Sequence, residues 1–325
     1  VDYSSDVLIG SNVLKQTSEV YRKMRGTIRF MLGCLSDFKA AEAVPYDQLP
    51  QIDRFMLHRL AEVQREVDGH FEDFAFSKAT TLIQKFNVVD LSGFYLDIVK
   101  DRVYILGETS FERRACQTVM REVLERLLLM IAPILPHLAE DAWQNLPADT
   151  SGDRSSESQK AAASIFQRGQ TEPPRGWTLA EGDLAAMAQL LAVRGEVNKA
   201  IEKSRQDKEV GSSLEAKVVI RARGQLLDTL TQYAQSTNGV DELRYLFICS
   251  AVEVVACGEA DEAEMSTEVD DLVGISVERA SGRRCARCWN YSESVGSFDS
   301  HKDICERCHP VVTAIESKEE SKVLA

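Results

Sequence analysis

The sequence predicts a mainly α-helical protein: an antiparallel helical bundle, followed by a small α/β junction and a four-cysteine zinc ribbon. Apolar residues recur at steps of three and four through most of the first 147 residues, which is typical of packed amphipathic helices. A further helical pattern then leads into two runs rich in β-branched residues. Two CxxC motifs stand in the last part of the chain.

These patterns divide the chain into four predicted regions. The boundaries follow shifts in composition and the polar, proline- and glycine-containing stretches between patterned segments. The regions are a helical bundle at 1–147, a polar loop or linker at 148–179, the α/β junction at 180–272 and the zinc ribbon at 273–325.

The first predicted helix covers about residues 11–37, with Ser11 as its expected N-cap. Its apolar residues form one stripe, and at about 100° per residue a set of bases falls on the opposite side. We therefore expect a helix that packs by one side and shows a basic surface on the other. A merely solvated charged face is the alternative. The bases are Lys15, Arg22, Arg25 and Arg29.

Three more helical patterns complete the predicted bundle. They cover about 51–86, 88–104 and 111–143, and Ser110 is a candidate N-cap for the last of them. Pro133 and Pro136 must kink or divide that last helix, because proline lacks the amide that continues the hydrogen-bond ladder. Successive helices joined by short polar loops are typical of an antiparallel bundle.

The chain changes character after the bundle. Residues 150–163 are polar and poor in bulky side chains, which indicates a loop insertion. A helix is predicted at about 180–209, with Gly211 as its stop. The runs at 216–222 and 245–256 are predicted strands.

Composition and charge exclude several classes of protein. The 325 residues are 44 % hydrophobic and 27 % charged, which rules out wholesale disorder. No apolar run reaches the ~18–20 residues that a membrane-spanning helix needs. A net charge of −13 disfavours electrostatic binding of nucleic acid by the protein surface as a whole. Any RNA contact must therefore come from local basic patches.

No autonomous catalytic site is indicated by the sequence. The motifs GxxxxGK[ST], GxGxxG, HExxH and GxSxG do not occur. The chain opens with Val-Asp-Tyr and shows no signal or transit pattern, so we expect it to be a piece of a longer protein.

Four of the eight cysteines form the most specific motif. Cys285-Ala-Arg-Cys288 is followed, after sixteen residues, by Cys305-Glu-Arg-Cys308. Two residues between the cysteines of a pair let one tight turn aim both sulfurs at one ion, and Zn²⁺ takes four thiolates in a tetrahedron. We predict that these four cysteines bind one structural zinc ion, with no open position for a catalytic water.

Alternatives to this zinc site and roles for its neighbours stay open at this point. The cysteines could form disulfides or redox-active pairs, or His301 or His309 could replace one of them as a ligand. One interpretation of the arginines around the motif is that they neutralise the negative charge of the tetrathiolate. Arg284 and Arg287, together with Trp289, are also candidates to contact RNA phosphates and bases.

Five segments carry a family likeness: YRKMRGTIRFMLGCLSDF, VVDLSGFYLDIVKDRVY, IAPILPHLAEDAW, VRGEVNKAIEKSRQDKEVGSSLEAKV and RCARCWNY with CERC. In this order they resemble the C-terminal portion of bacterial-type isoleucyl-tRNA synthetases, which are class I aminoacyl-tRNA synthetases. The first four segments resemble the synthetases for isoleucine, valine and leucine in general. The terminal ribbon narrows the likeness to the isoleucine branch, because valyl enzymes typically end in a coiled-coil arm.

The resemblance implies that tRNA binding and catalysis belong to different parts of the parent protein. The bundle would be the anticodon-binding domain and would hold the anticodon stem-loop of tRNA(Ile). The family's HIGH and KMSKS motifs do not occur here, so ATP binding and ligation of isoleucine would belong to a covalently continuous catalytic domain outside this chain. The resemblance implies neither a membrane nor a DNA partner. It implies a bacterial cytoplasmic location, or an organellar stroma or matrix.

The resemblance extends the candidate RNA contacts to two bases in the third helical pattern. These are Lys100 and Arg102, and the alternative is that they pair with Asp97 and Asp101. Two competing functions also remain: a free-standing tRNA-binding or chaperone-like module of the same ancestry, and a DNA-binding zinc ribbon of the repair type.

Overall fold

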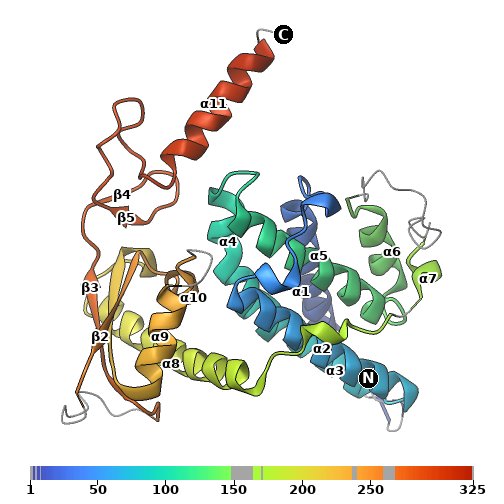
Figure 1. Ribbon diagram of the computed structural model, residues 1–325. Helices are drawn as coiled ribbons and strands as arrows, with labels where there is room; N and C mark the ends of the chain where they lie inside the picture. Colours follow the sequence, from blue (N-terminus) through green and yellow to red (C-terminus); the bar gives the residue numbers. More distant parts are fainter. Residues whose placement is uncertain are drawn as a thin grey trace. The chain divides into compact units, whose positions relative to one another are not determined.

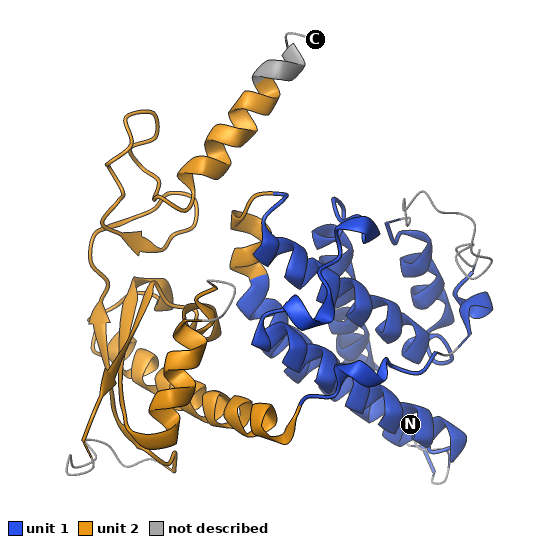
Figure 2. Cartoon of the chain, viewed as in Figure 1, with its two compact units in different colours: residues 1–99, 108–179 blue, residues 100–107, 180–325 orange. Residues whose placement is uncertain are grey.

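The computed structural model divides into two compact units (Figure 2). Unit 1 comprises residues 1–99 and 108–179, and unit 2 comprises residues 100–107 and 180–325. The structure describes residues 3, 6, 7, 9–147, 164–169, 171–235, 240–258 and 268–323. The predicted insertion at 150–163 lies outside the described residues.

Unit 1 is a helical bundle, as the sequence predicts. Figure 1 shows its helices packed against one another. Its helices are α1 (Ser11–Cys34), α2 (Gln51–Glu72), α3 (Phe76–Lys85), a π-helical segment (Phe86–Tyr95), the first turn of α4 (Leu96–Ile105), α5 (Phe111–Ile131), α6 (Pro136–Gln144) and the short α7 (Ile165–Arg168), with 3-10 turns at Ala40–Glu42, Tyr46–Gln48 and Arg175–Trp177.

Helix α5 lies at the centre of the bundle and packs against α1, α2, α3 and α6. Most of its residues are buried, including Leu124 and Met120. The Ser110 hydroxyl accepts a hydrogen bond from the Arg113 amide at 3.3 Å, which confirms the predicted N-cap. The predicted break is confirmed as well, because the chain leaves the helix before Pro133 and starts α6 at Pro136.

Two predicted helices differ from the structure at places that carry no proline. The pattern at 51–86 breaks between α2 and α3, where Phe74 takes a left-handed φ of 57° and its carbonyl accepts a 2.9 Å hydrogen bond from the Tyr3 hydroxyl. The pattern at 88–104 begins as a π-helix and ends as α4. The end of that π-helix is anchored by Tyr95, whose hydroxyl donates to the buried Asp53 carboxylate at 2.7 Å.

Helix α1 differs from its prediction at both ends. It ends at Cys34 rather than at 37, and its N-cap is Gly10 rather than Ser11, with no side-chain capping hydrogen bond. The apolar stripe is buried only from Met24 onward, whereas Val13 near the start is 41 % exposed. The first half of α1 therefore projects from the bundle core.

Residues 164–169 and 171–179, the described part of the predicted loop or linker at 148–179, belong to unit 1. Trp177 and Ile165 are buried. The Arg126 guanidinium donates to the Thr171 carbonyl at 3.3 Å and lies 4.8 Å from the centre of the Trp177 ring. Apolar burial and this cation–π contact hold the segment on the bundle.

The main part of unit 2 is a three-stranded sheet with packed helices. Strand β1 (Ala216–Ala222) is central, parallel to β2 (Ala251–Ala256) and antiparallel to β3 (Leu272–Arg279). Helices α8 (Glu181–Gln206), α9 (Gly224–Ala234) and α10 (Glu242–Phe247) pack against these strands and one another. The predicted helix at 180–209 and the predicted strand at 216–222 are confirmed.

Two strand predictions need correction. The run 245–256 starts inside α10, because the Asp241 carboxylate caps that helix through a 3.0 Å hydrogen bond from the Arg244 amide. The predicted ribbon region 273–325 takes in most of β3, but this strand pairs with β1 and so belongs to the sheet. The sheet thus extends to Arg279.

The ribbon follows the sheet within unit 2. It contains the two-stranded pair β4 (Arg283–Arg284) and β5 (Tyr291–Ser292) and is followed by α11 (His309–Val323). None of the helices in the described part of the chain is long and apolar enough to cross a membrane.

Candidate metal centre and nucleic-acid interface

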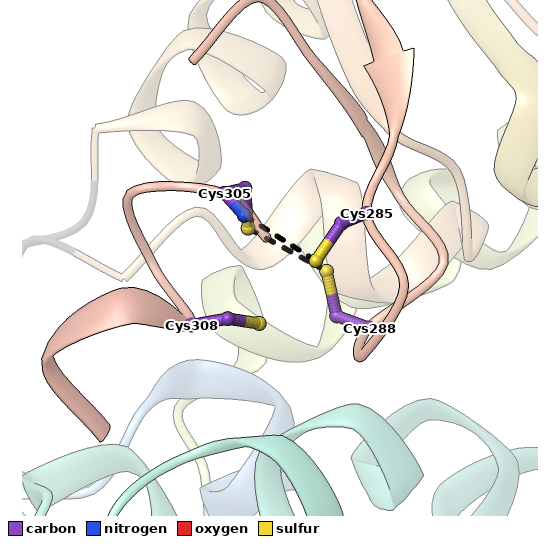
Figure 3. Close-up of side chains that lie close together, drawn as sticks. All are labelled: Cys285, Cys288, Cys305 and Cys308. Carbon is purple, nitrogen blue, oxygen red and sulfur yellow. Dashed lines mark hydrogen bonds between the residues drawn. The ribbon is translucent and has the colours of Figure 1, made fainter. Parts of the chain in front are cut away.

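The four predicted cysteine ligands come together in unit 2. Cys285 and Cys288 lie on the turn after β4, Cys305 on a loop, and Cys308 immediately before α11. Their sulfur atoms all lie within 4.8 Å of one another and point toward a common centre (Figure 3). All four side chains are buried.

Backbone hydrogen bonds shape both knuckles. In the first, the Trp289 amide donates to the Cys285 carbonyl at 3.0 Å. In the second, the Cys308 amide donates to the Cys305 carbonyl at 3.0 Å. The two knuckles also meet directly, since the Cys305 amide lies 3.4 Å from the Cys285 sulfur and donates to it. Amide donation of this kind stabilises a thiolate and suits a metal ligand.

This arrangement fits Zn²⁺. Zinc–sulfur bonds of about 2.3 Å in a tetrahedron place the sulfurs about 3.8 Å apart, and the sulfurs of Cys288 and Cys305 are 3.7 Å apart. Such a distance excludes a disulfide between them, and all eight cysteines are free. His309 and His301 have other partners, Ser300 at 3.1 Å and Glu316 at 3.0 Å, and the metal-binding cluster found among the described residues holds only the cysteines.

The thiols of the cluster differ from an isolated buried thiol. Hydrogen bonds with Cys288, the largest cause, and with Cys308 lower the pKa of Cys305, whereas hydrogen bonds with Cys288 and Cys305 raise the pKa of Cys308. By contrast, burial raises the pKa of the isolated Cys249 thiol to about 12. Because the clustered sulfurs form hydrogen bonds with one another, their protons are shared within the cluster, whereas Cys249 loses its proton alone.

Trp289 and Arg284 form an exposed aromatic–cationic pair on the ribbon. The Trp289 side chain is 56 % exposed, and the Arg284 guanidinium lies 5.2 Å from the centre of its ring. Trp289 also takes a left-handed φ of 67°, a conformation that costs a non-glycine residue of order 1 kcal/mol or more. The first knuckle thus exposes the Trp289 ring to solvent from a strained backbone position.

The predicted bases of α1 all lie on its exposed side. Lys15, Arg25 and Arg29 are exposed, as is Arg22, which pairs with Glu19 at 2.6 Å. Met24, Ile28 and Met31 occupy the buried side of the same helix. The helix therefore presents four bases on its exposed side, which we call the α1 basic face (Lys15, Arg22, Arg25 and Arg29).

Of the two candidates in the third helical pattern, Arg102 needs correction. Arg102 is only 2 % exposed and interacts with other residues of the chain, so its guanidinium is not available to RNA. It follows Ile98 by one helical turn, on the buried side of α4. Lys100 is exposed, and Asp101, one of the acids that the sequence offers as a partner for these bases, pairs instead with Arg307 at 2.7 Å.

Arg287 is partly buried and serves the ribbon itself. Its guanidinium donates to the carbonyl oxygens of Tyr104 and Ile105 and lies 3.7 Å from the Cys308 sulfur. The place of Arg287 beside a cysteine sulfur agrees with the predicted neutralisation of thiolate charge, but sequence reasoning missed its carbonyl partners and the pairing of Arg307 with Asp101. The available signal was the repeated Cys-x-Arg-Cys pattern, in which both knuckles place an arginine before the second cysteine.

Comparison with known families defines the class of protein. The family described as "Anticodon-binding domain of tRNA ligase" matches residues 53–220, just over half of the chain, from α2 through most of β1. The family described as "Zinc finger found in FPG and IleRS" matches residues 282–311, which contain the four cysteines. The chain belongs to the tRNA-ligase anticodon-binding family and carries this zinc finger.

The particular relatives are isoleucine–tRNA ligases. The chain is 48 % identical over 315 residues to that of Thermosynechococcus vestitus, covering 95 % of the chain and 32 % of the relative. It is 43 % identical over 325 residues to the chloroplastic/mitochondrial ligase of Arabidopsis thaliana, covering 97 % and 29 % respectively. The chain therefore spans about a third of the length of these relatives.

Proposed function

We propose that this chain is the anticodon-binding, C-terminal portion of an isoleucine–tRNA ligase. It holds the anticodon stem-loop of tRNA(Ile), while a class I catalytic domain outside the chain joins isoleucine to the tRNA with ATP. The observation that carries the proposal is the anticodon-binding family match across the bundle and into the sheet, joined to the zinc finger of the isoleucine branch. The competing repair-type function lacks any comparable support from the helical part.

The α1 basic face offers one surface for the RNA backbone. Its four bases lie on one exposed side of a single helix, so they can meet successive phosphates despite the overall charge of −13. Lys100 provides a further exposed base, and Arg102 is withdrawn from the interface because it is buried. Local positive charge supplies affinity and orientation, whereas base contacts supply specificity.

The ribbon offers a surface for unpaired bases. Anticodon bases are single-stranded and can stack on aromatic rings or guanidinium planes. The exposed Trp289 ring with the Arg284 guanidinium at its face presents both kinds of plane. We assign Arg287 to support of the metal centre instead, since its guanidinium is engaged by backbone carbonyls.

The proposal also specifies cofactor and location. One structural Zn²⁺ is bound by the four cysteines, and ATP is bound only by the catalytic domain. The protein acts where tRNA is charged, in the bacterial cytoplasm or, in a eukaryote, in an organellar stroma or matrix. The isolated chain is expected to show no isoleucine-dependent pyrophosphate exchange with ATP, and clear exchange would contradict this assignment.

The main test is binding of the zinc-loaded chain to tRNA(Ile) and to tRNA(Val), measured by filter binding over a series of salt concentrations. Arg22→Glu, Arg25→Glu and Arg29→Glu together should weaken binding. The slope of log affinity against log salt should fall by roughly 2–3, because each lost phosphate contact removes about 0.7–0.9. A charge-matched control carries Lys199→Glu, Lys203→Glu and Arg205→Glu on α8.

The control variant separates local contacts from net charge. If both triple variants bind tRNA equally, the α1 basic face is only solvated. Equal binding of tRNA(Ile), tRNA(Val) and duplex DNA by the unmodified chain would argue against the isoleucine assignment itself.

Trp289 gives an independent test on the ribbon. Trp289→Gly suits the left-handed backbone and should keep the zinc, yet it should weaken tRNA binding by ~5–150-fold, the equivalent of one lost stacking contact of about 1–3 kcal/mol. Trp289→Phe should recover much of the binding because it restores an aromatic face. Unchanged tRNA affinity in the glycine variant would remove Trp289 from the interface.

A further inference from the structure

The two cysteine knuckles each place an arginine immediately before their second cysteine, and both arginines reach the same short segment of unit 2. Arg287 belongs to the first knuckle and Arg307 to the second. The segment comprises residues 100–107, which include the second half of α4. Two side chains at equivalent motif positions thus converge on one helix end.

Arg287 lies between a metal ligand and the C-terminal end of α4. It donates hydrogen bonds to the carbonyl oxygens of Ile105 and, at 3.5 Å, of Tyr104, while its Nη1 lies 3.7 Å from the Cys308 sulfur. The last carbonyls of a helix lack partners within the helix and carry partial negative charge. A single guanidinium therefore satisfies a helix end and a thiolate at once.

Arg307 holds the same segment through a charge pair. Its Nη2 lies 2.7 Å from the Asp101 carboxylate, and both side chains are largely covered, with 23 % and 24 % exposed. Apolar contacts accompany the polar ones, because Ile105 packs against the buried cysteine cluster. The segment is therefore attached at Asp101, at the α4 carbonyls and at Ile105.

The charges explain why both residues are arginines. Four thiolates with one Zn²⁺ carry about two net negative charges, and the α4 end adds partial negative charge. Arginine keeps its proton and offers several donors in a fixed fork, so it can serve a sulfur and a carbonyl together. Lysine has the charge but not the fork.

We propose that Arg287 and Arg307 are positioning residues that couple metal loading of the ribbon to the order of residues 100–107. Formation of the metal-bound tetrathiolate fixes both knuckles, and the fixed knuckles hold the two guanidinium groups against α4. Coupling of this kind is reciprocal, so the contacts of Arg287 and Arg307 with residues 100–107 also strengthen metal binding. The inference concerns the chain alone and does not depend on RNA binding.

The test uses the full chain and two readouts. Zinc affinity is measured by competition with a chromophoric chelator, and order in 100–107 is measured by amide hydrogen exchange with and without zinc. Arg287→Gln should lower zinc affinity about 10–100-fold, the usual cost of removing a group that supports a metal ligand. Arg307→Gln and Asp101→Asn should each speed exchange in 100–107, with little further effect when combined.

Lys302→Gln is the matched control, because it removes an exposed ribbon base that lies outside both Cys-x-Arg-Cys motifs. It should change neither readout. The Co²⁺-loaded form of each variant, with its thiolate charge-transfer absorption, shows whether the four-sulfur site still assembles.

Two results would overturn the proposal. One is zinc affinity of Arg287→Gln within about twofold of the unmodified chain, far short of the loss expected for a supporting group. The other is exchange in 100–107 that is the same with and without zinc in the unmodified chain. If Arg287→Gln fails to fold, the Asp101→Asn variant and the zinc-free unmodified chain still decide the question, since neither alters the ribbon sequence.

Discussion

The helical bundle of unit 1 and the ribbon of unit 2 reach order by different physical means. The bundle buries a long series of aliphatic and aromatic side chains around α5, where Leu124 is fully covered. The buried cluster of the ribbon, within the described residues, consists of the four cysteines with Val295 and Ile304. Apolar burial can stabilise the first region, whereas the second has too little apolar surface and depends on its metal.

The two regions also use buried charge differently. In the bundle, Asp37 lies among Arg113, Arg114 and Gln117. Burial by itself would raise the pKa of Asp37, but hydrogen bonds from Arg113 and Gln117 outweigh it and lower that pKa below 3.8. In the ribbon, arginines instead face thiolates and a helix end. The bundle pairs charges to complete a core, and the ribbon pairs them to support a metal site.

Metal removal should separate the two regions most sharply. A chelator with reductant should abolish the order of residues 281–312, because structural zinc supplies an apparent ~10–16 kcal/mol to comparable small domains. The amides of α5 should stay protected from hydrogen exchange, and added zinc should restore the ribbon. Persistent protection of the ribbon in metal-free protein would show that its apolar cluster suffices.

A cavity in the bundle should produce the converse result. Leu124→Ala should lower the free energy of unfolding of unit 1 by about 2–5 kcal/mol, because it removes buried methyl groups and leaves a void. Zinc affinity should not change. The control Val89→Ala, at a side chain that is 56 % exposed, should stay within about 0.5 kcal/mol in urea denaturation. A large loss of zinc affinity in Leu124→Ala would show that the bundle core and the metal site are not stabilised separately.

The helix cap of α5 provides the smallest test. Ser110→Ala should destabilise unit 1 by about 1 kcal/mol, since it leaves the Arg113 amide without its side-chain acceptor. Ser110→Asp keeps an acceptor at the cap and should be nearly neutral. Thermal unfolding followed by circular dichroism measures both, and equal loss in the two variants would assign the effect to packing rather than capping.

Much of the fold could be predicted because the signals are local. Ser110 marks a helix start, and Pro133 with Pro136 marks a helix break, through backbone chemistry that needs no distant partner. The cysteine spacing is equally local, since each knuckle is one tight turn. The predicted Ser11 cap, by contrast, was wrong, because the preceding Gly10 takes the extended cap conformation instead.

The missed features depend on partners far away in the sequence. Strand β3 is a strand because β1 pairs with it, and the second half of α4 belongs with the ribbon because Arg287 and Arg307 reach it across about two hundred residues. The burial of Arg102 is of the same kind. The family resemblance made it a candidate RNA contact on a helix, but packing placed it inside.

The sequence by itself determined the helical class, the helix break at the prolines and the identity of the four candidate metal ligands, because propensity, capping and ligand chemistry act over a few residues. Only the tertiary structure decided which bases remain exposed and which arginines serve the metal centre. Exposure and electrostatic partnership are properties of surfaces that meet after the chain has folded, and one sequence read alone does not contain those distances.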